Sequence, residues 1–212
     1  MARGRFITFE GGEGAGKSTQ IARLGEALKA RGIEALVTRE PGGSPGAEEI
    51  RGLLLAGEIA RWDAMTEALL HFAARRDHLA RTVWPALDAG RWVLSDRFAD
   101  STMAYQGYAQ GIGRETVEAL YRLVVGEFVP DLTIILDVPP RVGLKRVDER
   151  KIDETRYERM KPDFHARLRE AYLDIAKREP ARCVVIDGTD SPDEVRAAIL
   201  DAVTERLALG AR

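Results

Sequence analysis

The chain has 212 residues, of which 31% are charged, yet its formal net charge is only −2 at pH 7. This length suits one domain with a sizeable core and leaves too little chain for two full domains. Balanced charge provides no global field for nucleic acid or an acidic membrane, so any anion site must be local. No apolar run approaches a bilayer-spanning length. We therefore expect a cytoplasmic protein without nucleic-acid or membrane partners.

The first predicted element is a short apolar strand, FITF at 6–9, which runs into GGEGAGKS and then into a helix. Glycines let successive backbone N–H groups turn toward a phosphate without a Cβ in the way, and a helix N-terminus adds partial positive charge. The segment therefore predicts a phosphate cradle more strongly than a plain glycine-rich turn. The residues expected to bind a nucleotide are Gly11, Gly12, Glu13, Gly14, Ala15, Gly16, Lys17, Ser18 and Thr19.

Two side chains of this loop carry chemistry in that interpretation. Lys17 can reach the β- and γ-phosphates of ATP as a mobile charge, and the Ser18 hydroxyl is placed to bind Mg²⁺. Hydrolase motors and GTPase switches carry similar loops, so the loop alone leaves the reaction open. The chain lacks the guanine-reading motif Asn-Lys-x-Asp and instead carries Arg, Glu, Phe and Gln clusters, which favours a small acceptor with its own phosphate.

Five short β-branched or aliphatic runs alternate with helical stretches along the chain. They lie at 6–9, 35–38, 92–95, 132–138 and 183–187. This alternation predicts an α/β fold with a parallel sheet flanked by helices, in a single domain spanning 1–212. Ligands of such sheets collect at the carboxyl ends of the strands, and polar side chains follow each of these runs.

Two of those strand ends carry candidate site residues. Glu40-Pro41 is followed by two glycines. A carboxylate, a fixed φ and two glycines together suit a rigid loop that packs against a ligand, more than a plain turn. Asp96 stands where phosphate-loop proteins keep a carboxylate that helps hold Mg²⁺. Arg97 offers a planar fork for a phosphate, although an arginine beside an aspartate can also form a structural ion pair.

The segment HFAARRDHL between the second and third strands predicts a helix that could contact a base. Phe72 offers a π-face, and Arg75 and Arg76 offer charge for a phosphate, although an aromatic at helical spacing also fits a core position. His71 and His78 lack partners at metal-ligand spacing, so we expect both to be structural or surface residues.

Three features mark the last third of the chain. Residues 145–161 are crowded with charge, which fits either a solvated helix face or a mobile lid that closes over phosphates. Cys183 lies in the apolar run CVVID and predicts a buried thiol, without an intrachain disulfide. Ser191 and Glu194 form a capping-box pattern that predicts the start of the last helix.

The phosphate loop, TREPGG at 38–43, DRFADSTMAYQG at 96–107 and PDLTIILDV at 130–138 together closely resemble bacterial thymidylate kinases. The resemblance runs from about residue 5 to residue 208. It implies the P-loop nucleoside-monophosphate kinase fold with a five-stranded parallel core sheet. It also implies transfer of the γ-phosphoryl group of MgATP to dTMP, giving dTDP, in a homodimer.

The resemblance assigns roles to individual residues. A strand-end acidic residue linked to Mg²⁺ falls on Glu10, so the expected metal-facing residues are Glu10, Ser18 and Asp96. Tyr105 is expected against the sugar near C2′, where it would penalise a ribose hydroxyl. The residues expected to bind dTMP are Glu40, Pro41, Phe72, Arg75, Arg97, Thr102, Tyr105 and Gln106.

The helix that carries HFAARRDHL departs from the family pattern at one position. Counting back from Pro85 without gaps puts the family's base-binding arginine on Arg75 and its stacking phenylalanine on His71. We expect Phe72 to be the stacking residue, because it is the aromatic hydrocarbon of the pair.

The acidic Glu13 within the loop resembles those family members that supply arginines from the lid. The charged residues of the lid segment at 145–161 include Arg146, Arg150, Lys151, Arg156 and Arg159. The residues expected to take part in catalysis are Lys17, Asp96, Arg97, Arg150 and Arg156.

Two alternatives remain open at this point. One is a related nucleoside or nucleoside-monophosphate kinase with a different base preference. The other is a nucleotide-dependent switch protein with no phosphoacceptor, although Arg97, Tyr105 and Gln106 make a polar pocket that a switch would not need.

Overall fold

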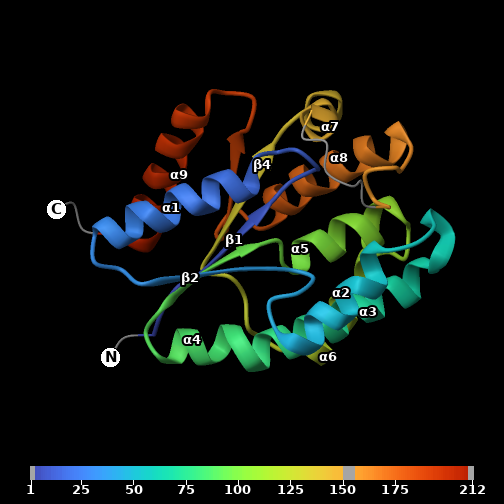
Figure 1. The fold of residues 1–212 in the computed structure, drawn as a ribbon, viewed down its shortest axis with the longest axis horizontal. Helices are drawn as coiled ribbons and strands as arrows, with labels where there is room; N and C mark the ends of the chain where they lie inside the picture. Colours follow the sequence, from blue (N-terminus) through green and yellow to red (C-terminus); the bar gives the residue numbers. More distant parts are fainter. Residues whose placement is uncertain (1–2, 150–155, 210–212) are drawn as a thin grey trace.

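A computed structural model describes residues 3–149 and 156–209 of the chain (Figure 1). Five parallel strands form one sheet in the order β2-β3-β1-β4-β5. Their bounds are β1 Phe6–Glu10, β2 Ala35–Arg39, β3 Trp92–Asp96, β4 Leu132–Asp137 and β5 Cys183–Asp187. The predicted α/β fold with five parallel strands is thereby confirmed.

Helices cover both faces of this sheet (Figure 1). They are α1 Lys17–Ala30, α2 Pro45–Leu55, η1 Ile59–Arg61, α3 Ala64–His78, η2 Leu79–Val83, α4 Trp84–Asp88, α5 Ala99–Thr102, η3 Met103–Ala109, α6 Arg114–Val124, α7 Pro140–Glu149, α8 Pro162–Arg178 and α9 Pro192–Leu207. The segments η2 and η3 are π-helical. None of the helices in the described ranges is both long and apolar enough to cross a bilayer.

The alternation of side chains along the strands produces two separate cores. Ile7 and Phe9 of β1 face α1 and α9, where they pack with Leu24 and Ile199. Phe6 faces the opposite side, in the core that contains α3 and α8. Successive side chains of a strand point to opposite faces, so a strand buried on both sides needs apolar residues throughout.

The strand register brings three loops to one edge of the sheet. Phe9 of β1 and Arg39 of β2 both pair with Asp96 of β3, so these three strands end at the same level. The residues that follow them, from Glu10 and Glu40 onward, therefore lie side by side. This is the edge at which the sequence predicted the chemistry.

Two predicted details of the C-terminal third are confirmed. The Ser191 side chain accepts a hydrogen bond from the Glu194 backbone, and the Glu194 side chain accepts one from the Ser191 backbone, which completes the capping box. Cys183 is a buried free thiol, and burial raises its pKa to about 12.

Candidate active site

The phosphate loop joins β1 to α1, and Lys17 is the first residue of the helix. Gly16 caps α1 with a φ of 94°, a left-handed conformation that glycine adopts without a Cβ clash. Gly14 lies so close to α7 that a Cβ there would meet the Gly143 carbonyl oxygen at 2.0 Å. The loop therefore needs glycine at both positions, one for conformation and one for contact.

Lys17 and Ser18 lie where the loop interpretation requires them. The buried Lys17 Nζ donates to the carbonyl oxygens of Gly11 at 3.3 Å and Gly12 at 3.1 Å. Burial, and then the nearby charge of Arg97, lower the pKa of this lysine. Ser18 Oγ donates to Asp96 Oδ2 at 2.9 Å. The structure thus brings Ser18 and Asp96 together as a pair of hard oxygen donors beside the loop, which fit Mg²⁺.

The Glu10 carboxylate accepts three hydrogen bonds from groups at the start of α5 and on α8. Its Oε1 accepts from the Phe98 N–H at 2.8 Å, and its Oε2 accepts from Ser101 Oγ at 2.6 Å and the Tyr172 hydroxyl at 3.2 Å. Burial, followed by the charge of Asp100, raises its pKa to about 7. Glu10 therefore ties the start of α5 and α8 to β1. Its expected metal-facing role stays a prediction.

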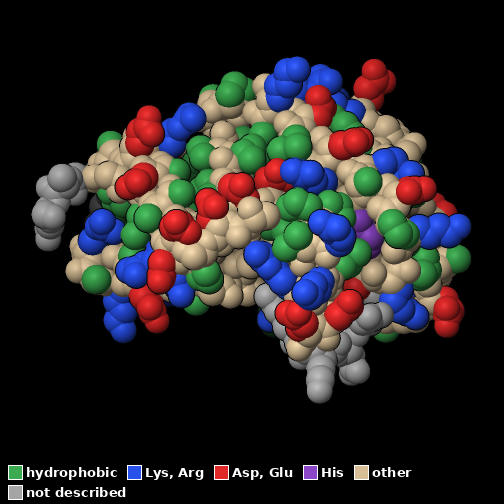
Figure 2. Space-filling view, turned by 90° about the horizontal axis from the view of Figure 1, so that it is seen from above, with side chains coloured by type: hydrophobic (Ala, Val, Ile, Leu, Met, Phe, Trp, Pro, Cys, Tyr) green, Lys and Arg blue, Asp and Glu red, His purple; other side chains and the backbone are tan. Residues whose placement is uncertain are grey.

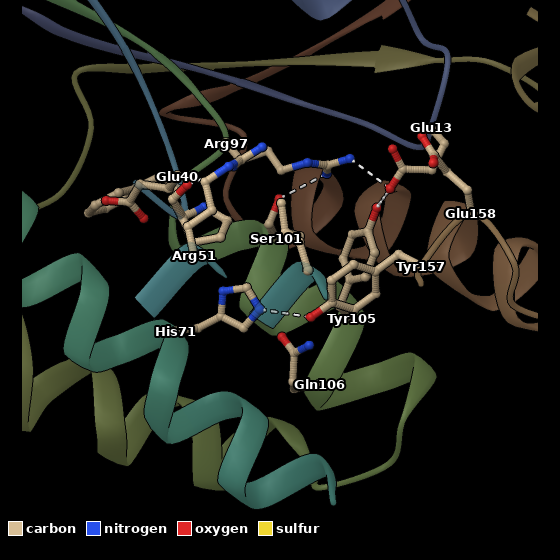
Figure 3. Close-up of a pocket in the computed structure, with 13 residues that line it drawn as sticks. Glu13, Glu40, Arg51, His71, Arg97, Ser101, Tyr105, Gln106, Tyr157 and Glu158 are labelled. Carbon is tan, nitrogen blue, oxygen red and sulfur yellow. Dashed lines mark hydrogen bonds and ion pairs between the residues drawn. The ribbon is translucent and has the colours of Figure 1, made fainter. Parts of the chain in front are cut away.

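Arg97 follows β3 in a left-handed conformation, with a φ of 71°. Its Nη1 donates to the Gly11 carbonyl at 3.0 Å and to the Tyr172 hydroxyl at 3.0 Å, and its Nη2 contacts Glu13 Oε1 at 3.1 Å. Figure 3 shows this side chain extended toward Glu13. Arg97 thus links the phosphate loop to the acceptor side, and its ion partner is Glu13 of the loop.

Glu13 and Tyr105 complete this link. The Tyr105 hydroxyl donates to Glu13 Oε1 at 2.5 Å, and the Arg97 guanidinium lies 5.1 Å from the centre of the Tyr105 ring. Although burial raises the pKa of the Glu13 carboxyl, the charges of Arg97 and then Lys17 outweigh it and lower that pKa. Glu13 is therefore an anion between two cations.

A cavity of about 230 Å³ opens beside this cluster (Figure 3). Its described lining residues are Glu13, Glu40, Pro41, Arg51, Leu55, His71, Arg97, Phe98, Ser101, Tyr105, Gln106, Tyr157 and Glu158. The space-filling view shows Lys and Arg side chains interspersed with Asp and Glu side chains over one face of the molecule (Figure 2). Two guanidinium groups, those of Arg51 and Arg97, line the cavity and can bind an anion. Three carboxylates, those of Glu13, Glu40 and Glu158, line it as well.

Glu40 lines the cavity and is held from behind by two cationic or polar groups. Arg75 Nε donates to Glu40 Oε2 at 2.8 Å, and His78 Nδ1 lies 2.9 Å from Glu40 Oε1. Arg75 also donates to Thr102 Oγ1 at 3.1 Å. Arg75, His78 and Thr102 are thus buried behind the cavity wall, where His78 has a structural role, as predicted.

The structure does not bring Phe72 to the cavity. Its side chain is 1% exposed and packs in the core, with the Arg75 guanidinium 4.9 Å from its ring centre. His71, one residue earlier, lines the cavity instead. Adjacent positions on a helix point about 100° apart, so only one of the two can face the cavity. We correct the base-facing position from Phe72 to His71.

The structure places Arg156 in the interior. Its guanidinium forms an ion pair with Glu67, and both side chains are fully buried. It also donates to the carbonyl oxygens of Leu54 at 2.6 Å and Ile59 at 3.1 Å. These contacts hold the guanidinium at α2, η1 and α3, so the expected catalytic role of Arg156 is corrected to a structural one.

The remaining lid arginines lie in different places. Arg146 of α7 donates to the Gly188 carbonyl at 3.0 Å and lies 3.5 Å from the carbonyl oxygen of Gly14 in the phosphate loop. The exposed Arg159 donates to the Gly57 carbonyl at 2.8 Å. Arg150 and Lys151, also expected in the lid, lie outside the described residues.

The sequence interpretation missed several lining residues. Arg51 donates to the Pro41 carbonyl at 2.7 Å, and Ser101 donates to Glu10. Tyr157 packs edge-on against Tyr105, with ring centres 5.3 Å apart. Arg51 lies on α2, the helix that directly follows the Glu40 loop, and its spacing from the other site residues matches no recognisable motif. Its position after the second strand was the only signal in the sequence.

Three comparisons place the chain among known proteins. Residues 9–199 match the thymidylate kinase family. A thymidylate kinase of Caulobacter vibrioides is 56% identical over 209 residues, which covers 99% of this chain and 100% of that protein. One of Rhizorhabdus wittichii is 49% identical and covers 96% and 99% of the two chains.

A solved structure agrees with these relatives. The thymidylate kinase of Ehrlichia chaffeensis superimposes with a TM-score of 0.77 at 34% identity, covering 95% of this chain and 99% of that one. Matches of this extent cover the sheet, the phosphate loop and the cavity alike. The chain belongs to the thymidylate kinase family.

Proposed function

We propose that this chain transfers the γ-phosphoryl group of ATP to the phosphate of dTMP, giving dTDP, with Mg²⁺ as cofactor. The observation that carries the proposal is the cavity lined by Arg51 and Arg97 beside the phosphate loop. A donor phosphate site and an anion-binding cavity in contact are what a nucleotide kinase needs. Family membership supplies the identity of the base.

The donor half of the proposed site is the loop with Lys17, Ser18 and Asp96. Lys17 stabilises charge on the transferring group, and the oxygens of Ser18 and Asp96 suit Mg²⁺, which prefers hard ligands. When bound with ATP, Mg²⁺ neutralises charge on the β- and γ-phosphates. The lid segment at 145–161 would close over these phosphates and exclude water.

The acceptor half aligns the dTMP phosphate for attack. Arg97 is fixed by Gly11, Tyr172 and Glu13 and can hold the acceptor phosphate in line with the donor. Arg51 lines the same cavity and can contribute a second guanidinium to that phosphate. Positioning and charge neutralisation account for most of the catalysis in phosphoryl transfer, so no covalent enzyme intermediate is required.

The sugar and base occupy the rest of the cavity in this proposal. Tyr105, held by Glu13, faces the deoxyribose near C2′. The His71 imidazole and the Gln106 amide form the wall for the base. Phe72 supports that wall from the core.

An acceptor panel tests the proposal. Purified protein with MgATP is offered dTMP, dUMP, dCMP, dAMP or no acceptor, and nucleoside diphosphates are separated by ion-exchange chromatography. We expect dTDP to form fastest. A different preferred acceptor would favour a related kinase, and ADP formation without any phosphorylated acceptor would favour a switch protein.

We also propose that the chain forms a homodimer. Large apolar side chains are exposed on three neighbouring helices: Leu53 on α2, Leu69 on α3 and Leu123 on α6, which is 82% exposed. Arg76 of α3 donates to the Val124 carbonyl of α6, so these two helices meet. Light scattering after size exclusion should give a dimer for the natural chain and a monomer for Leu123→Glu. A monomeric natural chain would contradict the proposal.

A further inference from the structure

A buried carboxylate, Glu67 on α3, lies directly behind the acceptor cavity. Its Oε1 accepts from Gln106 Nε2 at 2.6 Å, from Gln110 Nε2 at 2.9 Å and from the Tyr157 hydroxyl at 2.9 Å. Its Oε2 pairs with the Arg156 guanidinium. Gln106 and Tyr157 both line the cavity. The Glu67 carboxylate does not line the cavity itself, but it orients two side chains that do.

The charge of Glu67 determines which atom of Gln106 remains unbonded. A carboxylate paired with a guanidinium accepts hydrogen bonds and donates none. Gln106 must therefore turn its NH₂ group toward Glu67, and its Oε1 is left as a buried acceptor without a partner among the described residues. The side chain is only 1% exposed. A buried acceptor in this state is unfavourable unless a ligand N–H pairs with it.

The same constraint extends to His71 through Tyr157. Tyr157 gives its one proton to Glu67, so its oxygen accepts from Arg156 Nη2 at 3.3 Å and from His71 Nε2 at 3.0 Å. Nε2 therefore carries the imidazole hydrogen. Burial, and then the charge of Arg75, lower the pKa of His71 to about 3, so the ring is neutral. Its Nδ1, drawn on the side of the ring away from Tyr157 in Figure 3, is then an acceptor.

We propose that Glu67 is a positioning residue that sets the hydrogen-bond polarity of the base wall. Through Gln106 and Tyr157 it makes the cavity present acceptor atoms, which favour a base that donates a ring N–H over a base whose ring nitrogen is itself an acceptor. The inference rests on the proposed function, because it requires a pyrimidine in this cavity. Arg156 contributes as the countercharge that makes a buried Glu67 tolerable.

Replacing the carboxylate by an amide reverses this polarity. In Glu67→Gln, the amide oxygen faces the Arg156 guanidinium, and the new NH₂ group faces Gln106 and Tyr157. Gln106 then turns its oxygen toward residue 67 and its NH₂ group toward the cavity. Base selection should shift away from the imide edge of dTMP and dUMP and toward the ring-nitrogen acceptor of dCMP.

The first test compares Glu67→Gln with Gln110→Met. We expect Glu67→Gln to lower the ratio of kcat/KM for dTMP over dCMP by at least about tenfold, with an unchanged KM for ATP. Gln110 loses a bond to the same oxygen but does not line the cavity, so Gln110→Met should keep the ratio. An unchanged ratio in folded Glu67→Gln, or equal losses in both variants, would overturn the inference.

A second test needs no activity and covers the case in which Glu67→Gln does not fold. The chain has three histidines, so ¹⁵N spectra can be assigned by substitution. We expect the Nε2–H tautomer for His71 in the natural chain and a tautomer mixture in Tyr157→Phe, which keeps the Glu67–Arg156 pair. An Nδ1–H tautomer in the natural chain would overturn the inference and leave the proposed function standing. The expected tautomer without transfer to dTMP would contradict the proposed function alone.

Discussion

The phosphate loop and the acceptor cavity are built in different ways. The loop is one continuous stretch from the end of β1 to the start of α1, and its shape depends on backbone conformation at a few glycines. The cavity is assembled from the loops after β1, β2 and β3, from α2, α3, α5 and η3, and from Tyr157 and Glu158. Substitutions in the loop should therefore change the chemical step. Substitutions around the cavity should change acceptor binding or stability.

The largest effect should come from Lys17. Because Lys17 belongs to the phosphate loop, its replacement should lower the rate of phosphoryl transfer and leave the fold intact. We expect Lys17→Met to lower kcat on the order of 10³-fold or more, because a cation on the transferring group is lost. Lys29→Met, an exposed change at the end of the same helix, is the matched control. Initial rates with MgATP and dTMP, with circular dichroism melts, check both. Near-normal turnover in Lys17→Met would contradict the assignment of the loop.

Arg156 should show the opposite behaviour, with a loss of stability that exceeds any loss of chemistry. Arg156→Met leaves the fully buried Glu67 without a countercharge, which should lower the free energy of unfolding by roughly 3–5 kcal/mol. The exposed Arg159→Met is the control, and urea unfolding measures both. If stability is unchanged and kcat falls strongly, Arg156 has a catalytic role at the phosphates and the structural assignment is wrong.

Arg51 separates acceptor binding from donor binding. Arg51→Met should raise the KM for dTMP by about 10–100-fold through the loss of charge-assisted hydrogen bonds to the acceptor phosphate. The KM for ATP should not change. Arg39→Met removes an exposed guanidinium that pairs with Glu48 before the same loop and should leave both constants unchanged. If Arg51→Met raises the KM for ATP as much as the KM for dTMP, the site is not divided into a donor half and an acceptor half.

The smallest effect concerns the pH dependence of stability at His71. The pKa of His71 is about 3 in the folded protein and about 6.5 in the unfolded chain. Below pH 6.5 the unfolded chain therefore binds a proton at this residue that the folded protein does not bind. Stability is thus lost as pH falls from about 6.5 toward 3. Between pH 7 and pH 5 the natural chain should lose about 2 kcal/mol more than His71→Phe in urea unfolding. Equal losses would contradict a neutral, partly buried imidazole at this position.

Much of the fold followed from local patterns. Each of the five predicted strands occurs within a residue of its expected bounds, because apolar β-branched runs bounded by turns leave few alternatives. The phosphate loop was equally visible, since its glycines serve backbone conformation and close contact within one segment. Sequence reasoning succeeded where a feature is contiguous.

The acceptor side was less predictable, because its residues depend on partners far along the chain. The choice between His71 and Phe72 turns on the rotation of α3 about its axis, which packing against the core decides. Arg156 looked like a phosphate ligand because nothing in its neighbourhood reveals Glu67, 89 positions away. The three donors to Glu10, from Phe98, Ser101 and Tyr172, were equally invisible in its own neighbourhood of the sequence.

The central claim is that the loop and the cavity act together as donor and acceptor sites. The most direct measurement is the ratio of dTDP to ADP formed from γ-labelled ATP, with and without dTMP. The account predicts one labelled dTDP for each ADP, and ADP formation that nearly stops when dTMP is omitted. ADP released as fast without dTMP as with it, or label that appears as free phosphate, would contradict the account.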